Sequence, residues 1–81
     1  MGAWHRLSLE GHTMQKFAMT SCPYSATSFE DADERAEALA FARSYRSANM
    51  MVLHPRITDD AYGKDRVQLP SFSGDLWVRR A

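Results

Sequence analysis

The sequence has little cysteine, no surplus of either charge and no long hydrophobic run. Cys22 is its one cysteine, so no disulfide can form within the chain, which is typical of a reducing compartment. Lys and Arg total 10 and Asp and Glu total 10, so the chain lacks the positive surplus that non-specific nucleic-acid binding needs. Without a run long enough for a transmembrane helix or a signal peptide, we expect a cytoplasmic protein with no membrane partner.

Sequence motifs for catalysis and for metal binding are also missing. The three histidines and Cys22 do not stand at CxxC, HxxxH or a similar ligand spacing. There is no G-x-S-x-G motif and no phosphate-binding glycine loop. The adjacent acids Asp59 and Asp60 are more typical of a solvated turn than of a cation site. We therefore expect no enzyme activity, no cofactor and no metal ion.

The chain of 81 residues is long enough for one small domain, residues 1–81, and too short for two. Alternating patterns and turn residues predict strands and one helix in a fixed order. The predicted strands are 4–9, 14–20, 49–54, 67–69 and 76–79, and the helix lies between 27 and 48. The polar stretch 56–65 is predicted to be an exposed loop.

This order predicts an α+β fold, with one amphipathic helix packed on a mostly antiparallel sheet of four or five strands. The first two strands form a predicted hairpin around Glu10-Gly11-His12. Residues 49–54 are apolar on both faces, which is typical of a central strand, and Pro70 suits an edge position for 67–69. The connection through the helix is long enough for a parallel crossover.

The helix changes character along its length. Thr27 with Glu30, or Ser28 with Asp31, fits a capping box at its start, and Asn49 is a plausible stop. At 100° per residue, one narrow stripe is predicted to face the sheet. That stripe consists of Phe29, Ala32, Ala36, Leu39 and Ala40.

A second apolar face lies roughly opposite that stripe and needs a cover. It consists of Ala38, Phe41, Ala42 and Tyr45. Either a loop of the same chain covers it, or a partner or second copy does. The second alternative makes Phe41 and Tyr45 candidate partner-binding residues, in a monomer or a weak homodimer.

Tryptophans and arginines share faces on the two terminal strands. Trp4 alternates in phase with Arg6, and Trp77 with Arg79, so both pairs lie on the polar side of the sheet if Leu76 and Val78 face the helix. Tryptophan and arginine are enriched at interface hot spots, which makes these residues candidate partner-binding residues. The alternative is that each tryptophan only covers the sheet and stacks on a neighbouring arginine.

In size and element order the chain resembles small phage-encoded inhibitors of the anti-CRISPR kind. The strand-strand-helix-strand order and the capped helix TSFEDADERAEALAFARSYRSA carry this resemblance, without a diagnostic motif. It implies a small non-enzymatic protein-binding module that blocks a CRISPR-Cas defence complex by occupying its surface. The alternative function is a single-stranded nucleic-acid-binding domain, with Trp and Arg on the sheet face as a stacking platform, although the zero net charge makes nucleic acid the less expected partner.

Overall fold

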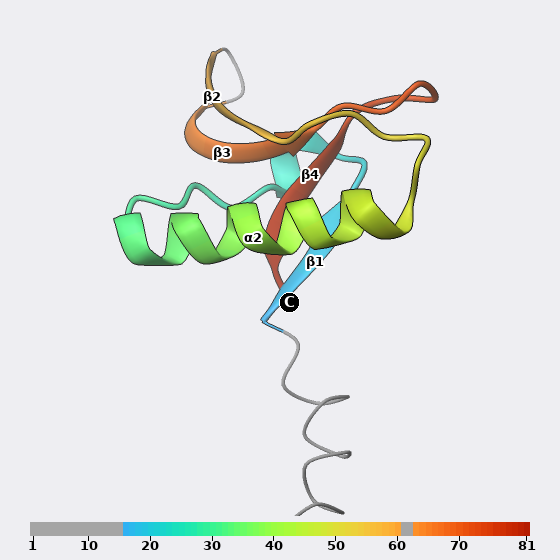
Figure 1. Cartoon of the computed structure of the whole chain (residues 1–81). Coiled ribbons are helices and arrows are strands. Elements are labelled where there is room, and N and C mark those ends of the chain that lie inside the picture. Colours follow the sequence, from blue (N-terminus) through green and yellow to red (C-terminus); the bar gives the residue numbers. More distant parts are fainter. Residues whose placement is uncertain (1–15, 61–62) are drawn as a thin grey trace, which may run out of the picture.

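The sheet has four antiparallel strands in the order β1-β4-β3-β2, and a helix crosses one of its faces (Figure 1). The computed structural model describes residues 16–60 and 63–81. In chain order the elements are β1 (Phe17–Thr20), the 3-10 turn η1 (Pro23–Ser25), α2 (Ala32–Ala48), β2 (Arg56–Asp60), β3 (Gly63–Leu69) and β4 (Leu76–Arg80). The predicted α+β class is confirmed. The predicted strand 4–9 and its turn lie outside the described residues.

The strand connections settle one open alternative and differ from one prediction. Every pair of neighbouring strands is antiparallel, so the parallel crossover that the length of the helical connection would allow is not formed. β3 pairs with both β2 and β4, so residues 67–69 lie in the interior of the sheet and not at its edge. Pro70 comes directly after the last residue of β3, so its missing backbone N–H removes no hydrogen bond between the strands.

The predictions for residues 49–54 and 56–65 are also wrong. Residues 49–54 form no central strand and contribute only an isolated bridge between Val52 and Ser71. The polar stretch instead supplies β2 and the start of β3, which pair as a hairpin. β2 is an edge strand in which, among residues 56–59, Thr58 alone is buried, at 1% exposure, so a largely polar sequence can occupy it.

α2 begins later than predicted and ends where predicted. Its N-cap is Asp31, whose Oδ1 accepts from the backbone N–H groups of Asp33 at 2.8 Å and Glu34 at 3.1 Å. Asn49 caps the other end, in an extended and not a left-handed conformation. The predicted capping boxes at Thr27 and Ser28 are therefore wrong, because an aspartate directly before the helix provides a complete cap.

The segment before α2 fills a gap between two strands. β3 and β4 pair only at Gln68–Trp77 and Leu69–Leu76. Beyond that point the backbone N–H of Thr27 donates to the Val78 carbonyl on β4, and that of Phe29 donates to the Asp65 carbonyl on β3. The side chains of Thr27 and Ser28 also bond to these strands: Thr27 Oγ1 accepts from the Arg80 N–H on β4, and Ser28 Oγ donates to the Lys64 carbonyl on β3. They are therefore not used as helix caps.

The face of α2 that meets the sheet is the one predicted to point away from it. Ala38 and Ala42 are fully buried in one cluster with side chains from β1, β3, β4 and the segment before α2. The cluster consists of Phe17, Phe29, Ala38, Ala42, Val67 and Val78, with Met19, Leu39 and Phe41 packed against it. In the predicted stripe Phe29 is buried and Leu39 half-buried, but all three alanines are exposed. The sheet itself covers the second apolar face.

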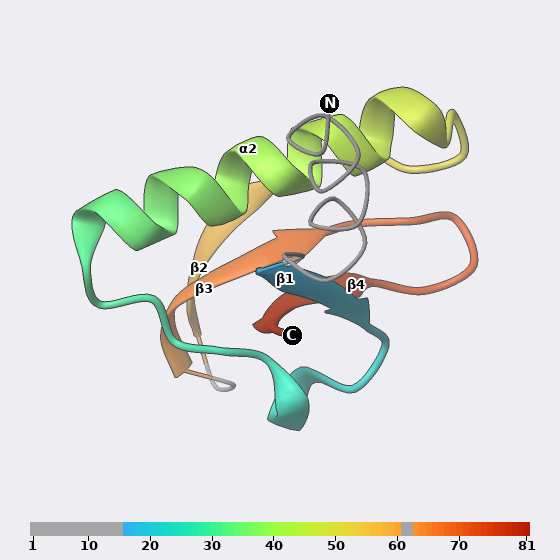
Figure 2. The same cartoon turned by 90° about the horizontal axis from the view of Figure 1, so that it is seen from below.

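The face of the sheet away from α2 is also partly covered. Arg56, Gln68, Trp77 and Thr20 form one row across all four strands on this face, because they are direct cross-strand partners. η1 lies on the opposite side of the sheet from α2 (Figure 2), and the Pro23 carbonyl accepts from Arg66 Nη1. Trp77 is consequently only 3% exposed.

Candidate interaction surfaces

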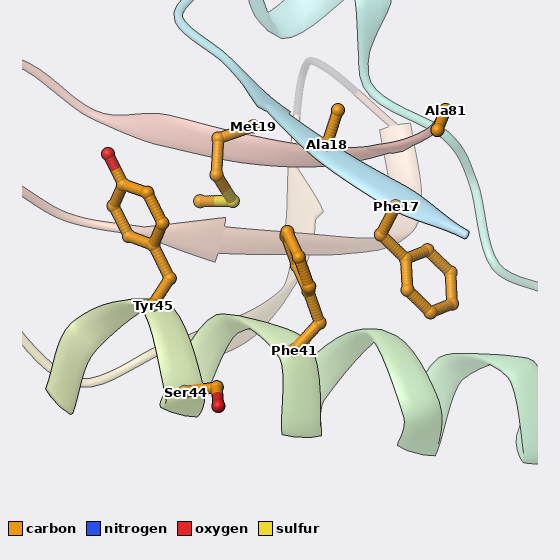
Figure 3. Close-up of a pocket in the computed structure, with 7 residues that line it drawn as sticks. All are labelled: Phe17, Ala18, Met19, Phe41, Ser44, Tyr45 and Ala81. Atoms are coloured by element: carbon orange, nitrogen blue, oxygen red, sulfur yellow. The ribbon is translucent and has the colours of Figure 1, made fainter. Parts of the chain in front are cut away.

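An apolar groove of about 760 Å³ lies between α2 and β1. Figure 3 shows Phe41 and Tyr45 on α2 extending toward β1, and Met19 on β1 extending toward α2, whereas Ala18 points away. The groove is lined by Phe17, Ala18, Met19, Phe41, Ser44, Tyr45 and Ala81. Its walls therefore come from one helix and one edge strand, and most of its lining side chains are apolar.

The floor of this groove is continuous with the core. The ring centroid of Phe41 lies 5.7 Å from that of Phe17, which in turn lies 5.7 Å from that of Phe29 in an edge-to-face arrangement. Such aromatic pairs add about 0.5–1.5 kcal/mol beyond the area that they bury. Tyr45 is half-buried and lies at the wall, outside that core cluster. The groove is thus held in shape by the fold, while Tyr45 provides a wall residue that can be changed separately.

An ion pair stands at one end of the groove. Lys16 Nζ lies 2.7 Å from Glu37 Oε1, and both side chains are more than half exposed. Lys16 directly precedes Phe17, and Glu37 lies about one helical turn before Phe41. The hydrogen bond to Glu37 raises the pKa of Lys16. This end of the groove is therefore polar, and the rest is apolar.

The edge strand beside the groove has one open side. β1 is the last strand of the sheet, and no strand among the described residues pairs with its outer edge. The Lys16 carbonyl accepts from Ala81, so Lys16 faces β4. Backbone groups alternate in direction along an antiparallel strand, so those of Phe17 and Met19 face the outer edge. These groups resemble the template that an added strand uses.

The predicted partner-binding residues do not form one surface. The structure brings Phe41 and Tyr45 together in the groove. Arg79 is exposed, but it lies on the other face of the sheet, beside Ala18. Trp77 lies on the face of the sheet away from α2, but it is buried there and not available as an exposed contact residue, and η1 lies on that side of the sheet. Trp4 and Arg6 lie outside the described residues.

Sequence reasoning missed Met19 and Ser44 as groove residues and missed a group of exposed apolar side chains elsewhere. The alternation over 14–20 placed Phe17 and Met19 on one face, which was the available signal for the groove wall. No sequence pattern indicated the exposed apolar side chains on the two connections, because the apolar run with Met50, Met51 and Leu53 predicts a buried strand. Together with Phe72 they are large exposed apolar residues on the two connections, from α2 to β2 and from β3 to β4.

Two further arrangements have electrostatic consequences outside the groove. Glu34 accepts from Arg80 through both oxygens, at 2.7 Å each, which lowers the pKa of Glu34 and raises that of Arg80. Arg80 also lies over the Phe29 ring, 5.8 Å from its centroid. The exposed thiol of Cys22 has a lowered pKa, chiefly through a hydrogen bond with the Ser25 side chain. The bidentate pair ties α2 to β4 beside the core.

Neither a metal cluster nor a spanning helix is found in the part of the chain that the structure describes. No group of three or more His, Cys, Asp or Glu side chains there could hold a metal ion. No helix there is long and apolar enough to cross a membrane. Comparison of the chain with protein-family models, with curated proteins and with solved structures finds no match. The groove is therefore interpreted from its own geometry.

Proposed function

We propose that the chain is a small non-enzymatic protein-binding module whose partner docks in the groove between α2 and β1. The observation that supports this most is the position of an apolar groove directly beside the open edge of β1. An open strand edge supplies backbone donors and acceptors, and a neighbouring apolar groove supplies burial for side chains. The non-enzymatic part of the proposal rests on the sequence, which has no catalytic motif.

The expected mode of binding is the addition of a strand. An extended segment of the partner lies along β1 and pairs with the outward backbone groups of Phe17 and Met19. Alternate side chains of that segment then point to the α2 side of the sheet, because side chains alternate along a strand. Apolar residues at those positions enter the groove and contact Phe41 and Tyr45. Backbone pairing gives affinity, and the groove selects the side chains.

The finer form of the proposal is a phage-encoded inhibitor that blocks a CRISPR-Cas defence complex by occupying its surface. It rests on the resemblance in size and element order. A cleavage assay with purified Cas effector complexes of several types, titrated with the chain, tests it directly. The finer proposal predicts inhibition that saturates near one chain per binding site on one of these complexes, and it fails if none is inhibited.

The binding role itself is tested by affinity capture with matched variants. Tyr45→Lys places a charge in the groove wall, whereas Arg79→Ala removes an exposed side chain on the other face of the sheet. We expect that a protein captured by the parent chain is not captured by the Tyr45→Lys variant and is still captured by the Arg79→Ala variant. Nuclease treatment before capture separates a protein partner from the nucleic-acid alternative. The proposal is contradicted if the Tyr45→Lys variant still captures that protein, or if nuclease treatment abolishes the capture.

A further inference from the structure

Four large apolar side chains are exposed together at one end of the molecule. They come from the connection between α2 and β2 and from the connection between β3 and β4, which lie side by side beyond the C-terminal end of α2 (Figures 1 and 2). Met50 is 89% exposed, Phe72 72%, Met51 64% and Leu53 46%. These four residues are called the apolar tip below.

The apolar tip is held by hydrogen bonds. The Val52–Ser71 bridge and a 2.8 Å bond from the Leu53 N–H to the Pro70 carbonyl join its two connections. Within the first connection the Met51 N–H donates to the Asn49 side chain at 3.2 Å. Val52, between the exposed residues Met51 and Leu53, is only 5% exposed, so its buried side chain anchors this connection. The fold therefore presents the apolar side chains to solvent on a defined scaffold.

Arginines outnumber acids around the apolar tip. Residues 38–58 contain three arginines and no acid, and the connection between β3 and β4 contains one acid, Asp75, whose Oδ2 accepts from Gln68 Nε2. Arg43 and Arg56 are exposed. Arg46 lines a small pocket of about 140 Å³ together with Ser47, Met50 and Val52, and its buried Nε has no hydrogen-bond partner. Arginines beside exposed apolar side chains suit a ligand that is both apolar and anionic.

We propose that the apolar tip docks on the surface of a bilayer that contains anionic phospholipids. Its apolar side chains enter the interface between headgroups and acyl chains, and the arginines contact lipid phosphates and carboxylates. The size of the patch favours a lipid surface over a protein. A specific protein interface buries about 800 Å² on each partner and uses about 20–30 residues of each, whereas the apolar tip consists of four side chains. A lipid surface accepts small protruding groups without complementary shape.

This proposal is independent of the groove and of the protein-binding function. Docking at a lipid surface needs no spanning helix, so it is compatible with the described residues containing none. The proposal revises the expectation of no membrane partner, because that expectation was based only on the lack of a membrane-spanning segment. The arginines near the apolar tip suit the cytoplasmic leaflet, where anionic lipids concentrate.

Co-sedimentation of the full chain with large unilamellar vesicles tests the proposal. One set of vesicles contains equal parts of phosphatidylserine and phosphatidylcholine, and the other contains phosphatidylcholine alone. We expect binding to the anionic vesicles at millimolar lipid, about tenfold or more stronger than to the neutral ones, and weaker at higher salt. Absence of binding to the anionic vesicles, or equal binding to both sets, overturns the proposal.

Matched variants locate the binding surface. The double change Met50→Ser with Phe72→Ser alters only exposed side chains and should weaken vesicle binding about tenfold or more. Tyr24→Ser is the control, since Tyr24 is an equally exposed aromatic, at 79%, on η1. Circular dichroism verifies that each variant is folded. Binding by the double variant at the parent level overturns the proposal, whereas normal vesicle binding by Tyr45→Lys separates this surface from the groove.

Discussion

The contact between α2 and the sheet is made through two alanines, and enlarging one of them should destabilise the fold. Ala42 has no exposed surface and lies in the core cluster with Val67 and Val78. Ala42→Leu adds three carbon atoms in a place that the core already fills. Overpacking of this kind typically costs about 1–3 kcal/mol. A domain of this length has a free energy of unfolding on the order of 4–12 kcal/mol, so the loss should be large.

Ala40→Leu is the matched control, because Ala40 is on the same helix and exposed. Leucine and alanine are both good helix formers, so this change should alter the free energy of unfolding by less than about 0.5 kcal/mol. Urea denaturation followed by circular dichroism measures the free energy of unfolding of both variants, and in thermal unfolding each kcal/mol should appear as a shift of about 4–8 °C in Tm. A tolerated Ala42→Leu together with a destabilising Ala40→Leu would refute the helix orientation described above.

Three other outcomes follow from the contacts outside the groove. Glu34→Gln should lower Tm more than Glu30→Gln, because only Glu34 is paired with Arg80. Since pairing lowers the folded-state pKa of Glu34, its stabilising effect should be full above an unfolded pKa of about 4.3 and vanish as the pH falls through the lower folded value. Cys22 should react with iodoacetamide at lower pH than an ordinary thiol, and Ser25→Ala should reduce that difference. Equal pH profiles for the parent protein and the Ser25→Ala variant would argue against the hydrogen bond. A chelator should leave Tm unchanged, and a clear fall would contradict the expectation that folding needs no metal.

The parts of the fold that could be predicted are those with local signals. A long run of helix formers and Asn49 identify α2 and its end, whereas the capping pattern at Thr27 or Ser28 predicts too early a start, because the cap is Asp31. Alternation around Trp77 and Val78 identifies the last strand, and these two elements already imply the α+β class. Local patterns were sufficient here because caps and alternation depend on neighbours in the sequence.

The orientation of α2 could not be predicted because alanine occupies all sides of the helix. Ala36 and Ala40 are exposed while Ala38 and Ala42 are buried, and a pattern of alanines gives no preference between these faces. Phe41 and Tyr45 were the better indicators, since large aromatic residues seldom remain fully in solvent. They were recognised as a face that needs a cover, but the sheet was not recognised as the cover.

The error over residues 49–54 and 56–65 has a related cause. Hydrophobicity alone favours a buried strand for Met50, Met51 and Leu53, yet the structure exposes all three. The burial of Trp77 likewise depends on η1, which is distant in the sequence. Contacts of this kind arise from the assembled fold, so a single sequence does not reveal them. For the groove, the sequence therefore indicated only Phe41 and Tyr45, as a helix face that needs a cover.

If a partner adds a strand to β1, its affinity should depend on the outward backbone N–H of Met19, and two variants at Met19 separate this N–H from the side chain. Met19→Ala removes the side chain but keeps the outward N–H, whereas Met19→Pro removes both and is tolerated best at a strand edge. With both variants verified as folded, we predict that the captured partner binds Met19→Ala within about tenfold of the parent, and Met19→Pro about a hundredfold more weakly. Equal affinities for the two variants would contradict strand addition.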